Sequence, residues 1–171
     1  MSKTTLKKEL NTLSQEQLVQ VVLDAYSSNS EFKEYFEFFL NPDVNKLIEK
    51  HEKKVVRELG KTKWGTSKAR ITVLKNSIKS FAGYNPGAEE VMKYMLNVLN
   101  RMGMTERYVD FTKAQMTYVE RLAKQIIEYG DKNELATEAI EKIEEILKNP
   151  NYTSYFRKHV SLGAAGEIGK F

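Results

Sequence analysis

Apolar residues recur at the three- and four-residue spacing of an amphipathic helix along most of this 171-residue chain, and strand-like alternation is nearly absent. Three such stripes are Leu18/Val21/Val22/Ala25, Val44/Leu47/Ile48/His51/Val55 and Val91/Tyr94/Met95/Val98, the last continued by Leu99 and Met102. The connections between them are short, so that successive helices are expected to pack as antiparallel neighbours. The pattern predicts an all-α fold of antiparallel helix pairs, packed as a bundle or a curved array of about nine helices.

Helix boundaries have their own signals. Each of the three prolines follows an asparagine, at Asn41-Pro42, Asn85-Pro86 and Asn149-Pro150, which suits the N-cap and first position of a helix. Ser14 with Gln17 is a capping-box pair, and Gly60, Gly103 and Gly130 stand where helices commonly end. The predicted helices cover residues 3–12, 14–27, 30–40, 42–59, 67–82, 87–102, 105–129, 133–148 and 151–160.

Length and composition limit the classes of protein. A chain of this length is expected to form one domain, here residues 1–160, followed by a glycine-rich tail at 161–171. There is no cysteine, which excludes disulfides and thiolate chemistry. The polar N-terminus is not a signal peptide, and no apolar run is long enough to cross a membrane. We expect a cytoplasmic protein without membrane contact.

The stretch EFKEYFEFFLNP, residues 31–42, carries five aromatic rings in eight positions. Phe32, Tyr35, Phe36 and Phe39 share one helix face at the spacing of a buried stripe, and Tyr152, Tyr155, Phe156 and His159 repeat this spacing. Core packing is the first interpretation of both sets, since large apolar side chains at helical spacing usually face inward. The alternative is a partner-binding groove anchored by Tyr and Phe. Phe38 lies outside the stripe, so it is a candidate partner contact if it is exposed.

The charge of the chain is uneven. The net charge is +4 overall, but residues 46–79 hold eleven Lys or Arg against three Glu, a net +8, whereas residues 116–148 hold five against eight acids, a net −3. A polyanion site in the basic segment would use Lys61, Lys63, Trp64, Lys68, Arg70, Lys75 and Lys79. Lysines beside an aromatic ring can follow a phosphate backbone while the ring stacks on a base. The alternative is a solvated helix face, or a basic segment packed against the acidic helices.

Several stretches of the chain resemble a known family. They are LKKELNTLSQEQL (6–18), the 23–26 stretch, FKEYFEFFLNP (32–42) and SKARITVLKNSIKSF (67–81), and they are similar to small all-helical bacterial proteins grouped as a domain of unknown function. The resemblance implies an array of antiparallel helices similar to an armadillo- or TPR-like superhelix. It implies no activity and assigns no site residue.

Motifs for catalysis are weak. GKTKWGTS (60–67) has the glycine spacing of a P-loop, but Thr66 stands where the phosphate-binding Lys belongs. His51 falls on an apolar stripe and His159 near an expected helix C-terminus, which indicates packing and dipole roles rather than metal binding. The acid pairs Glu89-Glu90 and Glu144-Glu145 are adjacent on helices, so that their side chains diverge. The sequence predicts no catalytic, cofactor-binding or metal-ligating residue, no cofactor, and no enzyme.

The function expected from these patterns is that of a non-catalytic helical protein that binds another macromolecule, with a protein as the expected partner. Binding of nucleic acid through residues 46–79 is the second hypothesis and an enzyme of unrecognised type is the third; the oligomeric state is left open.

Overall fold

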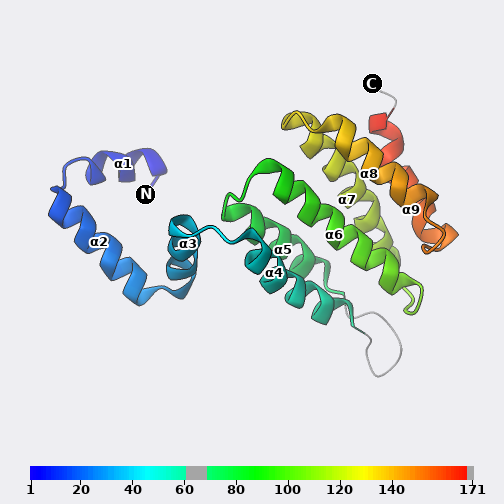
Figure 1. Cartoon of the computed structure of the whole chain (residues 1–171), viewed down its shortest axis with the longest axis horizontal. Coiled ribbons are helices and arrows are strands. Elements are labelled where there is room, and N and C mark those ends of the chain that lie inside the picture. Colours follow the sequence, from blue (N-terminus) through cyan, green and yellow to red (C-terminus); the bar gives the residue numbers. More distant parts are fainter. Residues whose placement is uncertain (61–68, 169–171) are drawn as a thin grey trace. The chain divides into compact units, whose positions relative to one another are not determined.

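A computed structural model describes residues 1–60 and 69–168 of the chain, with side chains through residue 165, and within these ranges it contains nine α-helices and no strand. They are α1 (Lys3–Leu10), α2 (Gln15–Ser28), α3 (Ser30–Leu40), α4 (Val44–Leu59), α5 (Ile71–Gly83), α6 (Ala88–Glu106), α7 (Lys113–Lys132), α8 (Ala136–Lys148) and α9 (Ser154–Ile168) (Figure 1). The predicted all-α fold is confirmed, whereas the armadillo- or TPR-like superhelix stays a prediction. In the described part of the chain, no helix combines the length and apolar character that a membrane span requires.

The chain divides into two compact units, Met1–Asp43 and Val44–Phe171. The first unit holds α1 to α3 and the second holds α4 to α9. The single domain expected over residues 1–160 stays a prediction beside this division.

Within the first unit, α2 and α3 pack together as a helical hairpin. The predicted capping box at the start of α2 is present, since Ser14 accepts from the Gln17 amide and the Gln17 side chain accepts from the Ser14 amide. Tyr26 of α2 meets the Phe36 ring edge-on at 6.4 Å, and the Tyr26 hydroxyl donates to the Glu37 carboxylate at 3.0 Å. This hydrogen bond to Glu37 raises the pKa of Tyr26.

No side chain of α1, α2 or α3 is fully buried. The prediction of a buried aromatic stripe on α3 is therefore wrong in part: Phe32 and Phe36 are half-buried, whereas Tyr35 is 40% and Phe39 65% exposed. Phe38, which lies outside the stripe, is half-buried. A two-helix hairpin covers only one side of each helix, so that an aromatic stripe as wide as this one extends beyond the contact.

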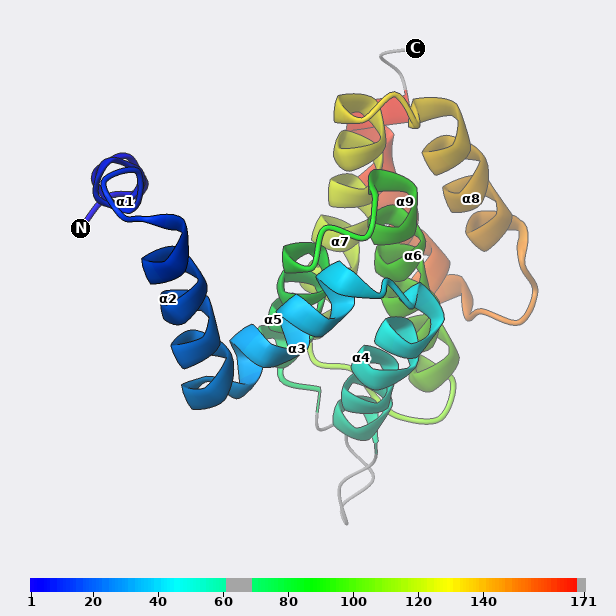
Figure 2. The same ribbon diagram turned by 60° about the vertical axis from the view of Figure 1, so that its left-hand side comes forward.

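The core of the second unit forms around α6 and α7, which lie side by side and also contact α4, α5, α8 and α9 (Figures 1 and 2). The predicted stripe of α6 is confirmed: Val91, Tyr94, Met95, Val98, Leu99 and Met102 are all buried. Leu47, His51 and Val55 of α4 and Leu74 and Phe81 of α5 are also buried. In the second aromatic set Tyr152 and Phe156 are buried as expected, whereas Tyr155 is 50% exposed.

Helices α7 and α9 have the most extensive contact in the unit. Their backbones approach so closely at Gly163 that an added Cβ would overlap the carbonyl oxygen of Glu120 and lie 2.8 Å from its carbonyl carbon. Ala164 beside it is fully buried. The expected helix end at residue 160 is therefore wrong, because residues 161–168 of the glycine-rich stretch continue α9. The small residues that suggested a tail are those that allow close helix packing.

Two other helix boundaries also differ from the expected ones. Gly103 does not end α6, which continues to Glu106, because this glycine makes room for the rings of Phe156 and Tyr152. Helix α7 begins at Lys113 rather than near residue 105, because Thr112 and Gln115 form a capping box there.

The Asn-Pro pairs precede three helices but do not open them as N-cap and first residue. Asn41 caps the C-terminus of α3, Gly87 with φ 111° is the N-cap of α6, and Asn149 caps the C-terminus of α8. At α9 the Thr153 hydroxyl accepts from the Phe156 amide at 3.0 Å. In each case the helix begins two to four residues beyond the proline. For α6 a glycine with positive φ is available there, and for α9 the Thr153 cap.

We expect Gly163→Ala to destabilise the protein by about 2–3 kcal/mol, because the new methyl group has to push the α7 backbone away at Glu120. Gly83→Ala is the matched control, since a Cβ at this last residue of α5 meets nothing within 4 Å. The control is expected to gain about 0.5 kcal/mol. Urea unfolding followed by circular dichroism measures both, and equal stabilities of the two variants would contradict the close contact of α7 with α9.

The buried pair of Tyr94 and Ser77, whose hydroxyl oxygens are 2.8 Å apart, predicts an alkaline loss of stability. Burial raises the pKa of Tyr94 to about 12 from the ordinary value near 10. The folded protein thus holds this proton at pH values where the unfolded chain releases it, so the free energy of unfolding falls from pH 10 to about 12. Tyr94→Phe is expected to show a shallower fall over this range, measured by urea unfolding at each pH. Parallel curves for the variant and the wild type would contradict this assignment.

Candidate functional site

The basic segment is only partly described. Lys61, Lys63, Trp64 and Lys68 lie outside the described residues, so their predicted role stays a prediction. Lys75 and Lys79 are exposed on α5, one turn apart, as a lysine stripe requires. The Lys75 ammonium lies 5.6 Å from the centroid of the Tyr118 ring of α7, a cation–π distance.

Arg70 forms a bidentate ion pair with Glu58 of α4. Its Nε and Nη2 donate to the two carboxylate oxygens at 2.8 and 3.0 Å, and its backbone N–H donates to Glu58 Oε1 at 2.8 Å. The hydrogen bonds from Arg70 lower the pKa of the Glu58 carboxyl against the opposing effect of its burial, and the same bonds raise the pKa of Arg70. Arg70, a residue of the predicted polyanion site, therefore compensates the negative charge of a buried carboxylate.

Sequence reasoning missed Glu58, although a signal for it was present. His51, Val55 and Glu58 stand at i, i+4 and i+7, so Glu58 continues the buried stripe of α4. A carboxylate at such a position needs a cation or hydrogen-bond donors.

His51 is buried and surrounded by aromatic rings, as its place on the apolar stripe predicted. It meets the rings of Phe81, Tyr84 and Tyr94 edge-on, with centroids 5.8, 6.0 and 6.1 Å away. The Phe81 and Tyr94 rings stack on each other at 4.3 Å. This cluster joins α4, α5 and α6 and gives His51 a packing role.

His159 lies in the middle of α9 rather than near a helix C-terminus, so the expected dipole role is wrong. Its Nδ1 lies 2.6 Å from Glu120 Oε1 of α7, and the Tyr155 ring stands edge-on at 4.6 Å. Because α9 extends to Ile168, His159 is nine residues before the end of the helix, too far for an interaction with the last turn. Its side chain contacts Glu120 of α7 instead. Among the described residues no group of three or more His, Asp or Glu is placed to hold a metal ion.

The paired acids form ion pairs with lysines of the same helix. Glu89 and Glu90 lie in the first turn of α6, and both contact the Lys93 ammonium. Glu144 pairs with Lys148 and Glu145 with Lys142 on α8. These contacts join residues three or four apart along one helix.

An exposed line of side chains on α3 is a candidate binding surface, which we call the α3 face: Glu31, Tyr35 and Phe39. The three residues follow one another at four-residue spacing and are all exposed. The Phe39 ring rests against Phe36 at 6.1 Å and Phe36 stacks on Phe32 at 5.7 Å, so the half-buried rings of the hairpin support the exposed one.

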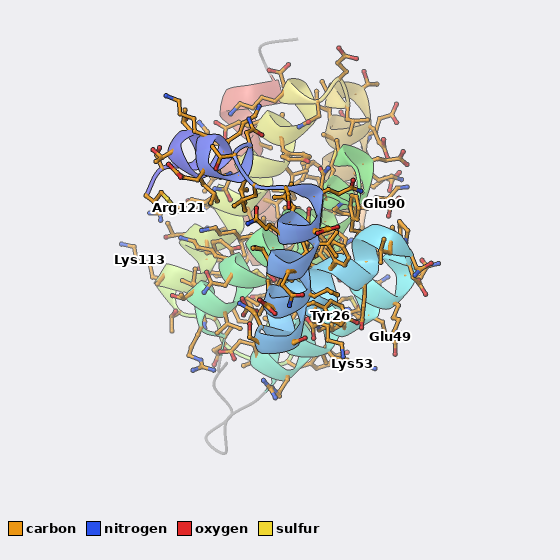
Figure 3. All side chains as sticks on the ribbon, turned by 90° about the vertical axis from the view of Figure 1, so that its left-hand side faces the viewer. Tyr26, Glu49, Lys53, Glu90, Lys113 and Arg121 are labelled. Carbon is orange, nitrogen blue, oxygen red and sulfur yellow. The ribbon has the colours of Figure 1, made fainter. Side chains whose placement is uncertain are left out.

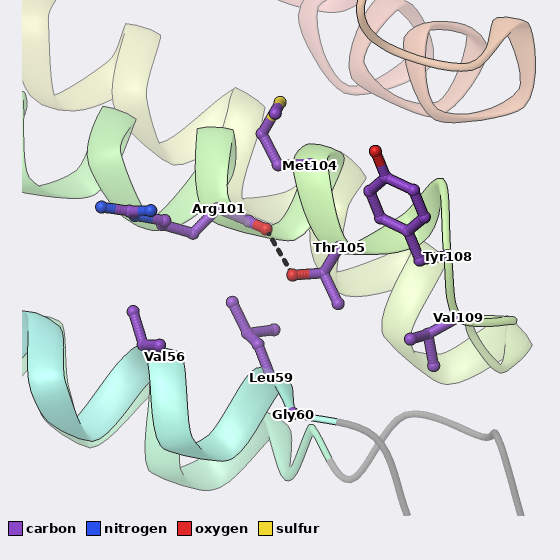
Figure 4. A pocket seen from close by; sticks show the side chains of 8 residues that line it. All are labelled: Val56, Leu59, Gly60, Arg101, Met104, Thr105, Tyr108 and Val109. Carbon is purple, nitrogen blue, oxygen red and sulfur yellow. Dashed lines mark hydrogen bonds between the residues drawn. The ribbon is translucent and has the colours of Figure 1, made fainter.

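The second unit carries an apolar groove of about 360 Å³ between α4 and α6 (Figure 4). This α4–α6 groove is lined by Val56, Leu59, Gly60, Arg101, Met104, Thr105, Tyr108 and Val109. Val56 and Leu59 point from α4 toward α6, with Arg101 at one end and Tyr108 and Val109 at the other (Figure 4). Val56, Met104 and Tyr108 are 49%, 44% and 63% exposed, so the groove presents apolar surface to solvent. No sequence pattern indicates this groove, because its lining residues come from two segments, 56–60 and 101–109, that are more than forty positions apart in the sequence.

The polar groups of the groove are already engaged within the second unit. The Thr105 hydroxyl donates to the Arg101 carbonyl at 2.8 Å, and Arg101 Nε donates to the Glu52 carboxylate at 2.8 Å. The Arg107 guanidinium lies 5.7 Å from the centroid of the Tyr108 ring. An apolar floor with arginines beside it suits a binding surface better than a reaction centre.

The described residues form a small all-α protein with two candidate surfaces, the α3 face and the α4–α6 groove. A family model described as a family of unknown function, DUF6155, matches residues 1–160, and the chain belongs to that family. Comparison with curated proteins and with solved structures gave no match.

The ion pair of Arg70 and Glu58 predicts a stability loss with a defined pH dependence. Arg70→Ala leaves the Glu58 carboxylate buried without its cation, so the urea midpoint at pH 7 is expected to fall. The lowered pKa of Glu58 means that the pair stabilises the protein above about pH 4.5 and that this contribution is lost as the pH falls further. The difference between variant and wild type should shrink in acid.

Lys53→Ala is the matched control for this variant. Lys53 pairs with Glu49 at 2.8 Å on α4, where both side chains are mostly exposed (Figure 3). Such surface pairs contribute little, so its midpoint should remain near that of the wild type. A loss in Arg70→Ala no larger than that of the control would show that the Glu58 pair is not structural.

Proposed function

We propose that this protein is a non-catalytic interaction module that binds another protein through the α3 face. One observation carries the proposal: the unit Met1–Asp43 has no fully buried side chain, although it holds many large apolar ones. The exposed members are Leu6, Val19, Val21, Leu23, Tyr35, Phe39 and Leu40. Scattered apolar side chains are normal on a surface, but a concentration of them indicates an interaction site.

The small apolar area buried within the unit Met1–Asp43 favours its binding to another protein surface. Apolar surface removed from water stabilises by about 25 cal/mol per Å², and a chain of about 40 residues rarely buries enough on its own to be stable. The unit obtains its internal contacts chiefly from one hairpin, α2 with α3. A partner that covers Tyr35 and Phe39 would add the apolar burial that the hairpin lacks.

The charge of the unit indicates the character of the partner. Residues 1–43 hold four lysines and seven acidic residues, a net −3, whereas the remaining residues carry the balance of the +4 total, a net +7. Glu31 stands at one end of the α3 face and the aromatic side chains at the other. A surface with an apolar pocket and nearby Arg or Lys would be complementary to it.

The chemistry of the second unit agrees with binding rather than catalysis. Glu58 is paired with Arg70, and Glu120 with His159. Catalysis needs titratable groups that converge on a site where substrate can enter. Glu58 and Glu120 instead join helices to one another, and the paired acids of α6 and α8 form ion pairs along single helices.

Photo-crosslinking tests this function. A photoreactive amino acid at position 39 is expected to give a discrete crosslinked protein in extracts of the source cells, and an excess of unlabelled wild-type protein should suppress it. Adding Tyr35→Ala should lower the yield about tenfold, since exposed aromatic anchors carry much of the energy of an interface.

Position 162 provides the control for this experiment. Leu162 of α9 is 56% exposed, comparable with Phe39, but lies in the second unit. The same probe there should give only diffuse, uncompeted products. Equal crosslinking at positions 39 and 162 would contradict a specific role for the α3 face.

A further inference from the structure

The helices of the unit Met1–Asp43 have strong local signals. Ser2 caps α1, and Ser14 forms a capping box with Gln17 at the start of α2. The side chain of Asn29 caps α3, where it accepts from two backbone amides of the first turn. Each of these caps acts within a single helix, so they favour helix formation without contributing contacts between helices.

The burial that stabilises helices in proteins is missing from this unit. Every hydrophobic side chain that is buried in the described chain lies between Leu47 and Ala164, outside the unit. The best covered side chains of the unit are half-buried: Leu10, Leu13, Leu18, Val22, Ala25, Tyr26, Phe32, Phe36 and Phe38. Because most helical stability comes from packing of an apolar face, the caps alone support these helices weakly.

The size of the unit adds to this imbalance. Helices α1, α2 and α3 have 8, 14 and 11 residues, and isolated helices shorter than about 12–15 residues are marginal in water. A unit of about 40 residues usually needs disulfides, a metal or a partner chain to be stable. The sequence has no cysteine, and the described residues include no group of three or more His, Asp or Glu placed to hold a metal ion.

From these observations we propose that the folding of Met1–Asp43 is coupled to binding. In the free protein its helices exchange with unfolded conformations, and a partner that covers the α3 face shifts the population to the folded hairpin. The coupling rests on the proposed function and adds the regulation of that site. Since only the folded fraction is competent to bind, changes in helix stability alter the apparent affinity without touching the α3 face.

Hydrogen exchange of the full-length protein, measured residue by residue by NMR, tests the free state. Amides in the middle of α2 and α3 are expected to exchange at least about a hundredfold faster than those of α6 and α7, whose apolar stripes form the core. Equal protection in the two pairs of helices would overturn the proposal, because the unit would then be as stable as the core.

The two capping boxes of the chain provide a matched pair of variants. Ser14→Ala and Thr112→Ala each remove a hydroxyl that accepts from a backbone amide, at the start of α2 and of α7. The loss of a cap changes the helix equilibrium about fivefold. We expect the Cα chemical shifts of α2 to move toward unfolded values in Ser14→Ala, whereas those of α7 stay unchanged in Thr112→Ala because its core side chains hold the helix. Unchanged shifts in Ser14→Ala would overturn the proposal.

A variant of opposite sign tests the coupling to binding. The Ser27 hydroxyl donates to the Leu23 carbonyl within α2, and alanine has the higher helix propensity, so Ser27→Ala is expected to favour the folded hairpin about twofold. Both Ser14 and Ser27 are exposed on α2, outside the α3 face. With the photoreactive residue at position 39, Ser14→Ala should lower the yield of the competed crosslink and Ser27→Ala should raise it.

The results separate this coupling from the interaction function itself. A specific crosslink at position 39 whose yield neither variant changes would overturn the coupling and leave the interaction function intact. Fast exchange in α2 and α3 without a specific crosslink at position 39 would overturn both the α3 face as a binding surface and the coupling that depends on it.

Discussion

The close approach of α9 to α7 is the contact on which the second unit depends. At Gly163 the backbone of α9 comes within van der Waals contact of the Glu120 carbonyl, which no side chain would permit. One turn earlier His159 reaches the Glu120 carboxylate, so a single residue of α7 meets α9 through both its backbone and its side chain. The ring of Phe156 is accommodated in the same way over Gly103 of α6. With α9 in place, α6 and α7 are covered and their apolar stripes become core.

The two units differ in whether neighbouring helices bury their apolar stripes. In Val44–Phe171 the apolar stripes of α6 and α7 are buried, and two buried polar side chains are paired, Tyr94 with Ser77 and Glu58 with Arg70. In Met1–Asp43 a similar apolar periodicity meets only one neighbouring helix and stays partly open to water. An exposed aromatic stripe of this kind is costly for a protein unless another surface covers it.

Much of the fold was predictable from local patterns. The capping box at Ser14 and the buried face of α6 from Val91 to Met102 were predicted and confirmed, because both depend on residues within a few positions of one another. The predicted helix ends at Gly103 and at residue 160 were wrong because they depend on residues far apart in the chain. Gly103 makes room for the rings of Phe156 and Tyr152, and Gly163 allows the backbone of α9 to approach Glu120 of α7. The candidate sites were less predictable. Arg70 looked like part of a basic patch until the fold placed Glu58 beside it, and the groove joins residues of α4 and α6 that no sequence pattern connects.

The sequence by itself determined that this chain forms helices, and approximately where, because caps, prolines and apolar periodicity act within one or two turns. It could not determine which apolar stripes are buried. Two aromatic sets, Phe32/Tyr35/Phe36/Phe39 and Tyr152/Tyr155/Phe156/His159, have the same spacing, but no member of the first is buried, whereas Tyr152 and Phe156 of the second are. Only the tertiary structure decided between them, because burial depends on which helix lies opposite, and that is set by contacts between residues far apart in the chain.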